Sequence, residues 1–553
     1  LADAVNNGDG GRVILWSEEY TGFLGSISAQ GGSVSGNGGF VETSSRDNLQ
    51  AFGSVQASAP WGEAGLWLLD PANVEIAAGT LNGSFNSGTP NIFTPDNTGS
   101  ATASATTIQT SLNGGTSVII QTGISTAGQP GNITLTAGIS KDATVAGTAS
   151  TLTMIAAGSI NISQPITSVD GALSLVLGAA AGVTVSSTIS TLGGDITIQG
   201  ANALGSALDT STTTVAFNNG ASISTLGGTG GGNLSITATG AITQNATSTL
   251  NIKGTTSVTT GNAAITLTQA SNDFNGAVSL ANTGGNAVAI TDLNALTLGT
   301  LAVGGNLTVT STGALNLGQG SVGGSLTATS NNNPISQSSP PGLSVTGLTT
   351  INAGTSSINL PGPGNAFTGG VLLSAGTITA FQNSVSTTLT PVGDITIGNI
   401  TIPGGTLTVT AGGSITINGN INVTTGTILL SAGNATTSPA SGQIILAGTP
   451  TITASRVGLV GYTIGIPTQP LLTIGGGVGG SITLAALASG GAASSNTDNR
   501  INSNSGIFIT NQGVATIGTV VDVAGFVSTG QGGIIFENNN NVIISSGISS
   551  KQQ

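Results

Sequence analysis

Along most of the chain, apolar residues alternate with polar ones. In residues 405–417, for example, Leu407, Val409, Ile415 and Ile417 are separated by Thr, or by short runs of Thr, Ala, Gly and Ser. A period of two is the pattern of β-strands that bury one face. Gly or Asn interrupts the alternation every four to six residues, and both tolerate positive φ at corners. The pattern therefore predicts short strands joined by tight turns, with no connection long enough for a helix.

The pattern recurs at fixed distances. Residues 295–311, "ALTLGTLAVGGNLTVTS", align without gaps with residues 314–330, "ALNLGQGSVGGSLTATS", at an offset of 19, and eleven of seventeen positions are identical. Residues 242–280 align with residues 335–373 at an offset of 93, close to five times 19, and thirteen of thirty-nine positions match. A repeat near twenty residues that is built of short strands predicts a solenoid, in which each unit buries its apolar face against the next.

These repeats predict an all-β fold, a parallel β-helix with coils of about 19–20 residues. Two or three short strands would form each coil, with Ile, Val and Leu stacked inside and Thr, Ser and Asn outside. The 93-residue repeat also places pairs of residues at equivalent positions, and we expect the two aromatic ones to be buried. The pairs in the core and at the turns are Phe274 and Phe367, Asn272 and Asn365, and Gly261 and Gly354.

Composition divides the chain into two parts. Residues 1–75 contain nine of the twenty acidic residues, two of the seven basic residues and all three Trp residues. The remainder is a nearly uncharged array rich in Gly, Thr, Ser and Asn. We therefore expect a leading β-helix segment, residues 1–76, and a β-helical repeat array, residues 77–553, with a boundary near Pro71–Ala78.

The leading segment carries a set of motifs in a defined order. They are a strand ending at Trp16, then "GSISAQGG" (25–32), "GNGGFVETS" (36–44), "GSVQASAPWGEAG" (53–65) and "LLDPANVEI" (68–76). Over these 67 or so residues the segment resembles the filamentous haemagglutinin-like exoproteins of two-partner secretion (type Vb) in Gram-negative bacteria. The Asn-Pro-Asn motifs of that family's N-terminal secretion domain are absent, so we expect that domain to lie upstream of Leu1 or to have been lost.

The resemblance implies a right-handed parallel β-helix that is exported across both membranes. It implies a secreted protein of the bacterial cell surface or of biofilms, acting as an adhesin or an extracellular filament. The implied partners are an outer-membrane two-partner transporter during export, and a receptor or glycan on a host or neighbouring cell. Within the motifs we expect Trp16, Phe40 and Trp67 to belong to the structural core.

The residue types exclude most catalytic and metal-binding chemistry. The sequence has no His and no Cys, and therefore no Ser-His-Asp triad, cysteine nucleophile, Cys/His zinc site or haem axial histidine. Seven Lys and Arg against twenty Asp and Glu give a net charge of −13, which leaves no basic footprint for a nucleic acid. We expect no enzymatic activity, no catalytic residue, no cofactor and no metal.

Two alternative functions remain open. Some β-helical proteins act on polysaccharides, but that chemistry needs several carboxylates on one face, whereas the acids after residue 76 are scattered. Asp273 and Asp292 lie at the same offset of 19 and could stack on neighbouring coils, although we expect solvated loop positions there rather than a metal. The other alternative is a passive stalk for an effector beyond Gln553.

Both ends of the chain are strand-like, as "GRVILW" (11–16) and "GGIIFENNNNVIISSGISS" (532–550) show. The open ends of a β-helix present unpaired backbone groups, which solenoids normally cover with capping units. We therefore expect either that the chain is part of a longer solenoid or that copies stack end to end into filaments.

Asn-x-Ser/Thr triplets recur in the sequence. In eukaryotic secretion they would be glycan acceptors, but we interpret most of them as a turn Asn followed by a strand Thr. The triplets begin at Asn82, Asn132, Asn161, Asn233, Asn245, Asn306, Asn399, Asn422 and Asn434.

Overall fold

The structure is a computed structural model of the 553-residue chain. It describes residues 1–79, 83–89, 93–95, 101–123, 129–202, 205–209, 213–228, 230–337, 341–383, 386–389, 391, 393–433, 442–465, 471–475, 481–488, 506–520, 523–528, 533–538 and 540–550. The chain forms two compact units, Leu1–Leu293 and Asn294–Gln553. The compositional change near Pro71–Ala78 lies inside the first unit.

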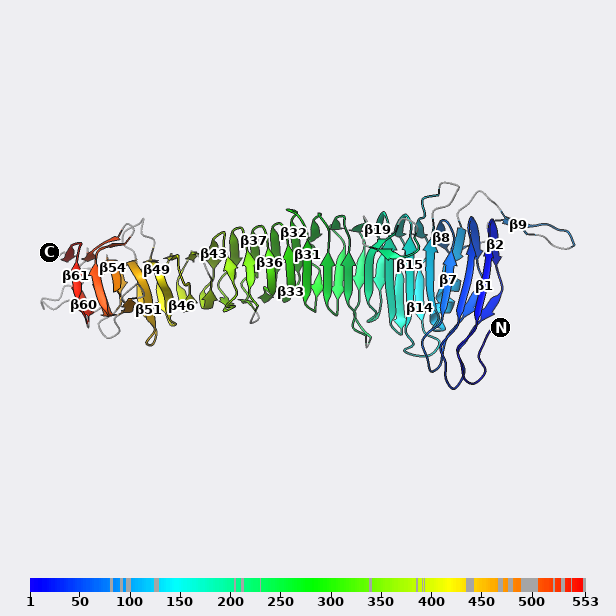
Figure 1. The fold of residues 1–553 in the computed structure, drawn as a ribbon, viewed down its shortest axis with the longest axis horizontal. Helices are drawn as coiled ribbons and strands as arrows, with labels where there is room; N and C mark the ends of the chain where they lie inside the picture. The colour runs from blue at the N-terminus through cyan, green and yellow to red at the C-terminus, as the bar shows by residue number, and fades with distance from the viewer. Residues whose placement is uncertain are drawn as a thin grey trace. The chain divides into compact units, whose positions relative to one another are not determined.

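The first unit is a parallel β-helix with three faces, on which strands of successive coils lie side by side (Figure 1). Face 1 contains, in spatial order, β1 (Arg12–Ser17), β4 (Phe40–Ser45), β7 (Leu66–Asp70), β12 (Ser117–Thr122), β15 (Ser150–Ala156), β18 (Leu173–Ala179), β21 (Ile196–Ala201), β25 (Leu234–Thr237), β28 (Thr256–Thr259) and β31 (Val278–Asn282). Face 2 contains β2 (Tyr20–Phe23), β5 (Asn48–Ala51), β11 (Ala101–Ser104), β8 (Val74–Ala77), β13 (Ile133–Leu135), β16 (Ser159–Ile162), β19 (Gly182–Val185), β23 (Thr214–Phe217), β26 (Ile242–Gln244), β29 (Ile265–Leu267) and β32 (Val288–Asp292).

Face 3 of this unit is broken by a helix. Its strands are β3 (Ser26–Ser28), β6 (Ser54–Gln56), β14 (Ile139–Asp142), β17 (Ile166–Asp170), β20 (Thr188–Ser190), β24 (Ser222–Ser224), β27 (Thr249–Ile252) and β30 (Asp273–Phe274). Helix α1 (Ala105–Asn113) contacts both β6 and β14. The amide oxygens of Gln109 and Asn113 accept backbone N–H groups of β14, at 3.1 and 2.8 Å, so the helix covers the edge of that sheet.

Helix α1 is a correction to the expectation that no connection contains a helix. Its apolar residues Ala105, Ile108 and Leu112 recur at helical spacing and are buried. The strand before it, β11, is also out of order, because it pairs with both β5 and β8 although it follows them in sequence. The segment between β8 and β11 includes the antiparallel pair β9 (Gly83–Phe85) and β10 (Phe93–Pro95), and β22 (Leu208–Asp209) pairs antiparallel with the end of β21.

The second unit is built in the same way. One row of parallel strands contains β34 (Leu307–Ser311), β37 (Leu326–Thr329), β40 (Thr349–Asn352), β43 (Val371–Ser374), β45 (Thr387–Leu389), β47 (Thr406–Ala411), β49 (Ile421–Ala432), β51 (Thr451–Gly461), β54 (Ser481–Ala488), β59 (Phe526–Ser528) and β62 (Ile548–Ser550). A second row contains β33 (Leu296–Val303), β35 (Leu315–Asn316), β38 (Ile335–Ser336), β41 (Ser357–Leu360), β44 (Thr377–Gln382), β46 (Ile395–Thr401), β48 (Ile415–Ile417), β50 (Gln443–Leu446), β52 (Thr463–Ile464), β55 (Gly506–Gln512) and β60 (Gly533–Asn538).

Shorter rows complete this unit. One is the row of β36 (Gln319–Val322), β39 (Leu343–Val345) and β42 (Ala366–Phe367). Strand β53 (Leu471–Gly475) pairs with β51 and β55, and β56 (Val514–Ile517) pairs with β54 and with β61 (Val542–Ile544). Strands β57 (Thr519–Val520) and β58 (Val523–Ala524) form an antiparallel pair. The long strands β49 and β51 pair over two separate stretches, with an irregularity between them. The predicted all-β parallel β-helix is therefore confirmed in both units.

The interior consists of stacked aliphatic side chains, as the alternation predicts. Leu175 of β18 pairs with Leu152 of β15 and with Ile196 of β21, and all three side chains are at most 1% exposed. Coil length, however, varies along the chain. The pairing of Leu296 with Leu315 matches the offset of the short repeat, whereas the pairing of Arg12 with Phe40 encloses a clearly longer coil. The expected coil length is thus only one of several.

The extra residues of the first coils form loops that project beyond β1, β4 and β7 (Figure 1). These loops contact one another backbone to backbone. A Cβ atom on Gly36 would overlap the carbonyl oxygen of Gly8, and one on Gly38 would overlap that of Ala57. Gly36 also has φ +122°, which L side chains rarely adopt. The motif "GNGGF" therefore contains glycine because the loops stack without side chains between them.

Candidate interaction surface

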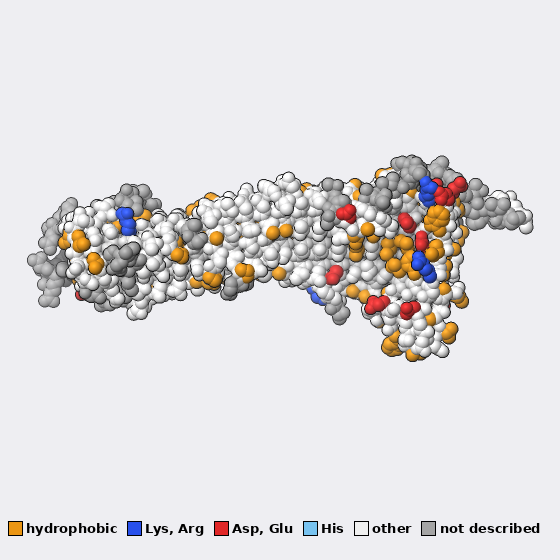
Figure 2. Space-filling model, viewed as in Figure 1, with side chains coloured by type: hydrophobic (Ala, Val, Ile, Leu, Met, Phe, Trp, Pro, Cys, Tyr) orange, Lys and Arg blue, Asp and Glu red, His pale blue; other side chains and the backbone are white. Residues whose placement is uncertain are grey.

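The outer side of face 1 is apolar over its first four strands. Alternation along β1, β4, β7 and β12 points every second side chain away from the core. Ile14 and Trp16 are 49% and 59% exposed, and Leu68 is partly exposed. Figure 2 shows apolar side chains gathered over these strands. We call this patch the apolar outer face; it consists of Ile14, Trp16, Phe40, Leu66, Leu68 and Ile119.

Three later strands of the same sheet, β21, β25 and β28, have polar residues at the corresponding outward positions. They are Thr197 and Gln199 in β21, Ser235 and Thr237 in β25, and Ser257 and Thr259 in β28. The β-helix therefore does not need apolar residues on this side. Contiguous exposed apolar residues that the fold does not require are typical of interaction sites.

Three charged residues lie within the apolar outer face. The guanidinium group of Arg12 lies 4.7 Å from the centre of the Phe40 ring, a cation–π contact. Glu42 of β4 and Asp70 of β7 are both partly buried. Burial, and secondarily the negative charge of Glu42, raise the pKa of Asp70 to about 6. This face therefore changes charge in mildly acidic solution.

The projecting loops present a second exposed apolar group. Val5, Val34 and Trp61 are 82%, 62% and 74% exposed. The Trp61 indole N–H donates a hydrogen bond to the Ser33 carbonyl oxygen, at 2.9 Å, which fixes the ring on the neighbouring loop. Asn37 links the same loops, because its N–H donates to Asp9 and its Oδ1 accepts from the Glu63 N–H.

The aromatic residues expected in the core of the leading segment are divided between the two sides of face 1. Trp67 is completely buried, donates its indole N–H to Thr43 Oγ1 at 2.9 Å and packs edge-to-face against Phe23. Trp16 is exposed and Phe40 is partly exposed. The expectation that Trp16 and Phe40 belong to the core is wrong, because strand alternation points both outward beside inward-facing neighbours.

Residues of the 93-residue repeat occupy matching environments in the two units. Phe274 and Phe367 are buried, at 1% and 0% exposure. Gly261 lies between β28 and β29, and Gly354 lies between β40 and β41. Gly354 has φ +60°, and a Cβ atom there would overlap Asn332 Oδ1, so this turn needs glycine.

The two buried asparagines of the repeat each form a reciprocal pair of hydrogen bonds with a glutamine. Asn272 accepts from Gln244 Nε2 at 2.6 Å and donates to Gln244 Oε1 at 2.9 Å. Asn365 and Gln337 make the same two bonds, at 2.9 and 2.8 Å. In each copy the asparagine Oδ1 also accepts a backbone N–H of the intervening strand. These amides satisfy one another inside the helix, as buried polar groups must.

Asparagines at corners connect successive coils. The Oδ1 atoms of Asn132, Asn233, Asn306 and Asn399 each accept a backbone N–H of the following coil. All four begin an Asn-x-Ser/Thr triplet, and Asn132, Asn233 and Asn306 lie between strands, as the turn interpretation predicts. The interpretation is wrong for Asn399, Asn161 and Asn422, which lie within β46, β16 and β49. Asn82 and Asn434 lie outside the described residues.

Two lysines, Lys141 and Lys253, donate hydrogen bonds to backbone carbonyl oxygens. Lys141 is fully buried, and its ammonium group donates to the carbonyl oxygens of Thr148, Asp170 and Gly171 at 2.6, 2.8 and 3.3 Å. Burial lowers the pKa of Lys141 from its ordinary value, partly offset by nearby aspartates. Lys253 in the same way donates to the carbonyl oxygens of Gly227, Gly228 and Gly230. Both lysines therefore have structural partners.

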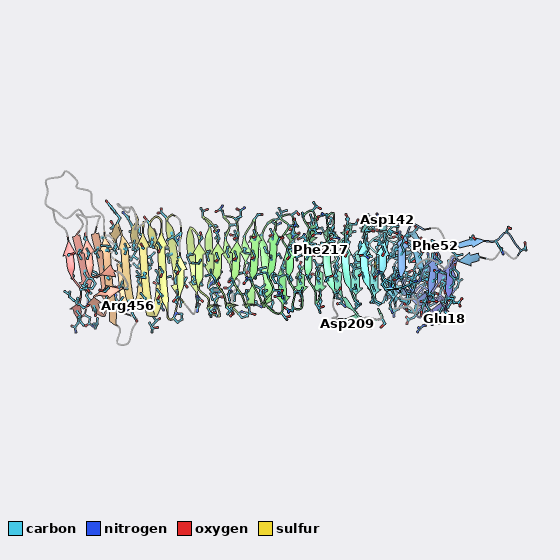
Figure 3. The ribbon with its side chains drawn as sticks, turned by 90° about the horizontal axis from the view of Figure 1, so that it is seen from above. Glu18, Phe52, Asp142, Asp209, Phe217 and Arg456 are labelled. Carbon is cyan, nitrogen blue, oxygen red and sulfur yellow. The ribbon has the colours of Figure 1, made fainter. Side chains whose placement is uncertain are left out.

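The acidic residues do not converge on a catalytic centre in the described part of the chain. Figure 3 shows Glu18, Asp142 and Asp209 at separate places on the first unit. Asp292 is buried and accepts the Phe274 N–H at 2.8 Å, whereas Asp273 is partly exposed beside that inward phenylalanine. Among the described residues, no three His, Cys, Asp or Glu side chains could together hold a metal. Nor does any described helix have the length and apolarity to span a membrane.

Comparison with known families gives a match to the repeat array. A family described as repeats of unknown function (DUF5649) matches residues 210–281, 285–316, 304–374 and 383–449. Two of these segments, 210–281 and 304–374, contain the two reciprocal amide pairs. No curated protein matches the chain. The chain thus shares repeats with this family over less than half of its length.

Proposed function

We propose that the chain is a secreted structural protein of the cell surface, an adhesin or filament subunit without catalytic activity. The observation that carries the proposal is the apolar outer face, where Ile14, Trp16 and Leu68 lie at positions that β21, β25 and β28 fill with Thr, Ser and Gln. A stiff β-helix holds such a face in a fixed geometry, because each coil is hydrogen-bonded to the next. The resemblance of residues 10–76 to two-partner exoproteins supports export through an outer-membrane transporter of that type.

Self-association is the second part of the proposal. Val542 and Ile544 of β61 pair with Ala515 and Ile517 of β56. Ala515 and Ile517 are buried, whereas Val542 and Ile544 are 42% and 62% exposed. A second copy stacked on β61 would bury these side chains, as would a further coil of a longer chain. The low charge of the chain offers little repulsion against such stacking.

Adhesion by coated beads tests the proposed binding role. Beads that carry the purified chain should attach to host or neighbouring bacterial cells, and the triple variant Ile14→Thr, Trp16→Thr, Leu68→Thr should attach much less. A triple variant of the same sheet, Thr197→Ser, Ser235→Thr, Thr259→Ser, is the matched control and should attach normally. Equal attachment by both variants would refute the role of this face, and no attachment by any of the proteins would favour a passive stalk.

A further inference from the structure

Two carboxylates on the apolar outer face belong to adjacent strands. Glu42 pairs in register with Leu68, and Asp70 lies two residues further along β7 on the same outward side. Strands in a sheet are about 4.8 Å apart and outward side chains repeat about every 6.7 Å, so the two side chains are diagonal neighbours. Glu42 is close enough to act on Asp70 electrostatically.

A buried hydroxyl is a near neighbour of both carboxylates. Ser44 is in register with Asp70 and stands two residues after Glu42, so all three side chains are on the outward side of face 1. The Ser44 side chain is only 1% exposed, and its Oγ atom has no hydrogen-bond partner among the described residues. A buried hydroxyl without a partner is energetically costly, which indicates that another group completes its environment.

We propose that Glu42, Ser44 and Asp70 form a binding site for a divalent cation, with calcium as the ion that fits best. Calcium takes oxygen ligands from carboxylates, hydroxyl or carbonyl groups and water, and it tolerates irregular geometry. The amide of Gln121 stands on the next strand, directly after Ile120, which pairs with Leu69, and can add a fourth oxygen. Magnesium fits less well because it demands near-ideal octahedral geometry.

The electrostatics of the site favour a cation. Glu42 and Asp70 lie on the same outward side of adjacent strands, so their ionised forms repel each other, and a cation between them removes that repulsion. With two carboxylates and partial exposure, we expect a dissociation constant of about 10⁻⁴–10⁻³ M, the range of extracellular calcium modules. Bound calcium would also make the apolar outer face electrically neutral apart from Arg12.

Calcium titration calorimetry of the full chain tests the site, with circular dichroism to verify that each variant is folded. Asp70→Asn and Glu42→Gln should each lower calcium affinity about tenfold or more, since each removes one of the two charged ligands. Ser44→Ala should lower it a few-fold. Asp209→Asn, which changes an exposed acid of β22, is the matched control and should leave the affinity unchanged.

The inference is overturned if the wild type binds no calcium up to about 10 mM, roughly ten times the weakest expected dissociation constant. It is equally overturned if Asp70→Asn and Glu42→Gln bind calcium as the wild type does. Terbium luminescence provides an independent measurement, because Trp16 beside Ser44 can sensitise a bound terbium ion. Calcium should displace that signal in the wild type, and Asp70→Asn should need about tenfold or more terbium to reach the same signal. The measurement does not depend on adhesion, so its outcome is separate from that of the bead assay.

Discussion

The reciprocal amide pair of the repeat provides the sharpest test of the packing. Replacing Asn272 with Ala removes both hydrogen bonds to Gln244 and the bond from the Leu250 N–H. It also removes weaker bonds from Asn272 Nδ2 to the carbonyls of Leu267 and Thr291. All of these groups lie inside the β-helix, where water cannot easily replace the lost partner.

The expected cost follows from the groups left without partners. The Leu250 N–H loses its bond to Asn272. Gln244 keeps two longer bonds, both of 3.3 Å: its Nε2 donates to the Ser248 carbonyl oxygen, and its Oε1 accepts the Gln269 N–H. A buried polar group that loses its partner costs about 1–3 kcal/mol. Two such groups give a local destabilisation of about 2–6 kcal/mol. Replacing Gln244 with Met at the same time removes the second amide, so the double variant should be more stable than the sum of the single effects by about 1–3 kcal/mol.

Hydrogen exchange by mass spectrometry is the appropriate assay, because a solenoid opens locally rather than as one cooperative unit. Peptides from residues 242–280 should lose protection in Asn272→Ala, whereas peptides from residues 150–185 should not change. Asn365→Ala should have the same effect in residues 335–373. Additive effects of Asn272→Ala and Gln244→Met would refute the coupling, and unchanged protection in Asn272→Ala would refute the pairing itself.

Individual side chains provide the remaining predictions. Phe274→Ala and Phe367→Ala should each lower local stability in hydrogen exchange by about 3–5 kcal/mol, since both rings are fully buried. The pKa of Asp70 is about 6 in the folded chain and near 3.9 in an unfolded one, so the folded state binds more protons between these values. Stability should therefore rise as pH falls from 7 to 4, by at most about 3 kcal/mol, and urea unfolding of Asp70→Asn should lack that rise. Lys141→Met should expose the residue 148–171 backbone to exchange, because three carbonyls lose their donor at a cost of about 1–3 kcal/mol. Ile544→Asp should abolish end-to-end filaments in electron micrographs if copies stack on β61, and filaments that persist in this variant would place the contact elsewhere.

The sequence was sufficient to predict the general fold because its strongest signal is local. Alternation with frequent glycine requires strands and turns, and a short repeat allows few arrangements other than stacked coils. The repeat also identified Phe274 and Phe367 as equivalent inward residues. It marked Gln244 and Asn272 as identical in both copies, although nothing in the sequence indicated that their side chains bond to each other from one coil to the next.

Helix α1 was beyond prediction because the segment has weak helix propensity. Its nine residues include three Thr, and only the spacing of Ala105, Ile108 and Leu112 favours a helix. Its position is decided by tertiary contacts. The helix lies on face 3 between β6 and β14, and the strand directly before it, β11, is inserted between β5 and β8 on face 2. Local propensity does not encode an insertion of this kind.

The apolar outer face shows why alternation alone could not identify the candidate site. In "VILW" of β1 and "LWLL" of β7 both alternating sets are apolar, so the pattern cannot tell which set faces the core. Only the pairing of neighbouring strands decides it, because Trp67 aligns with the inward Val41 while Trp16 aligns with Ser44. The same pairing brings Glu42, Ser44 and Asp70 together across coils that are longer than the short repeat and that the repeat therefore does not describe. A chemical site on a β-helix is thus assembled by register, and the register of the first coils follows a spacing of about 28 residues that the 19-residue repeat does not describe.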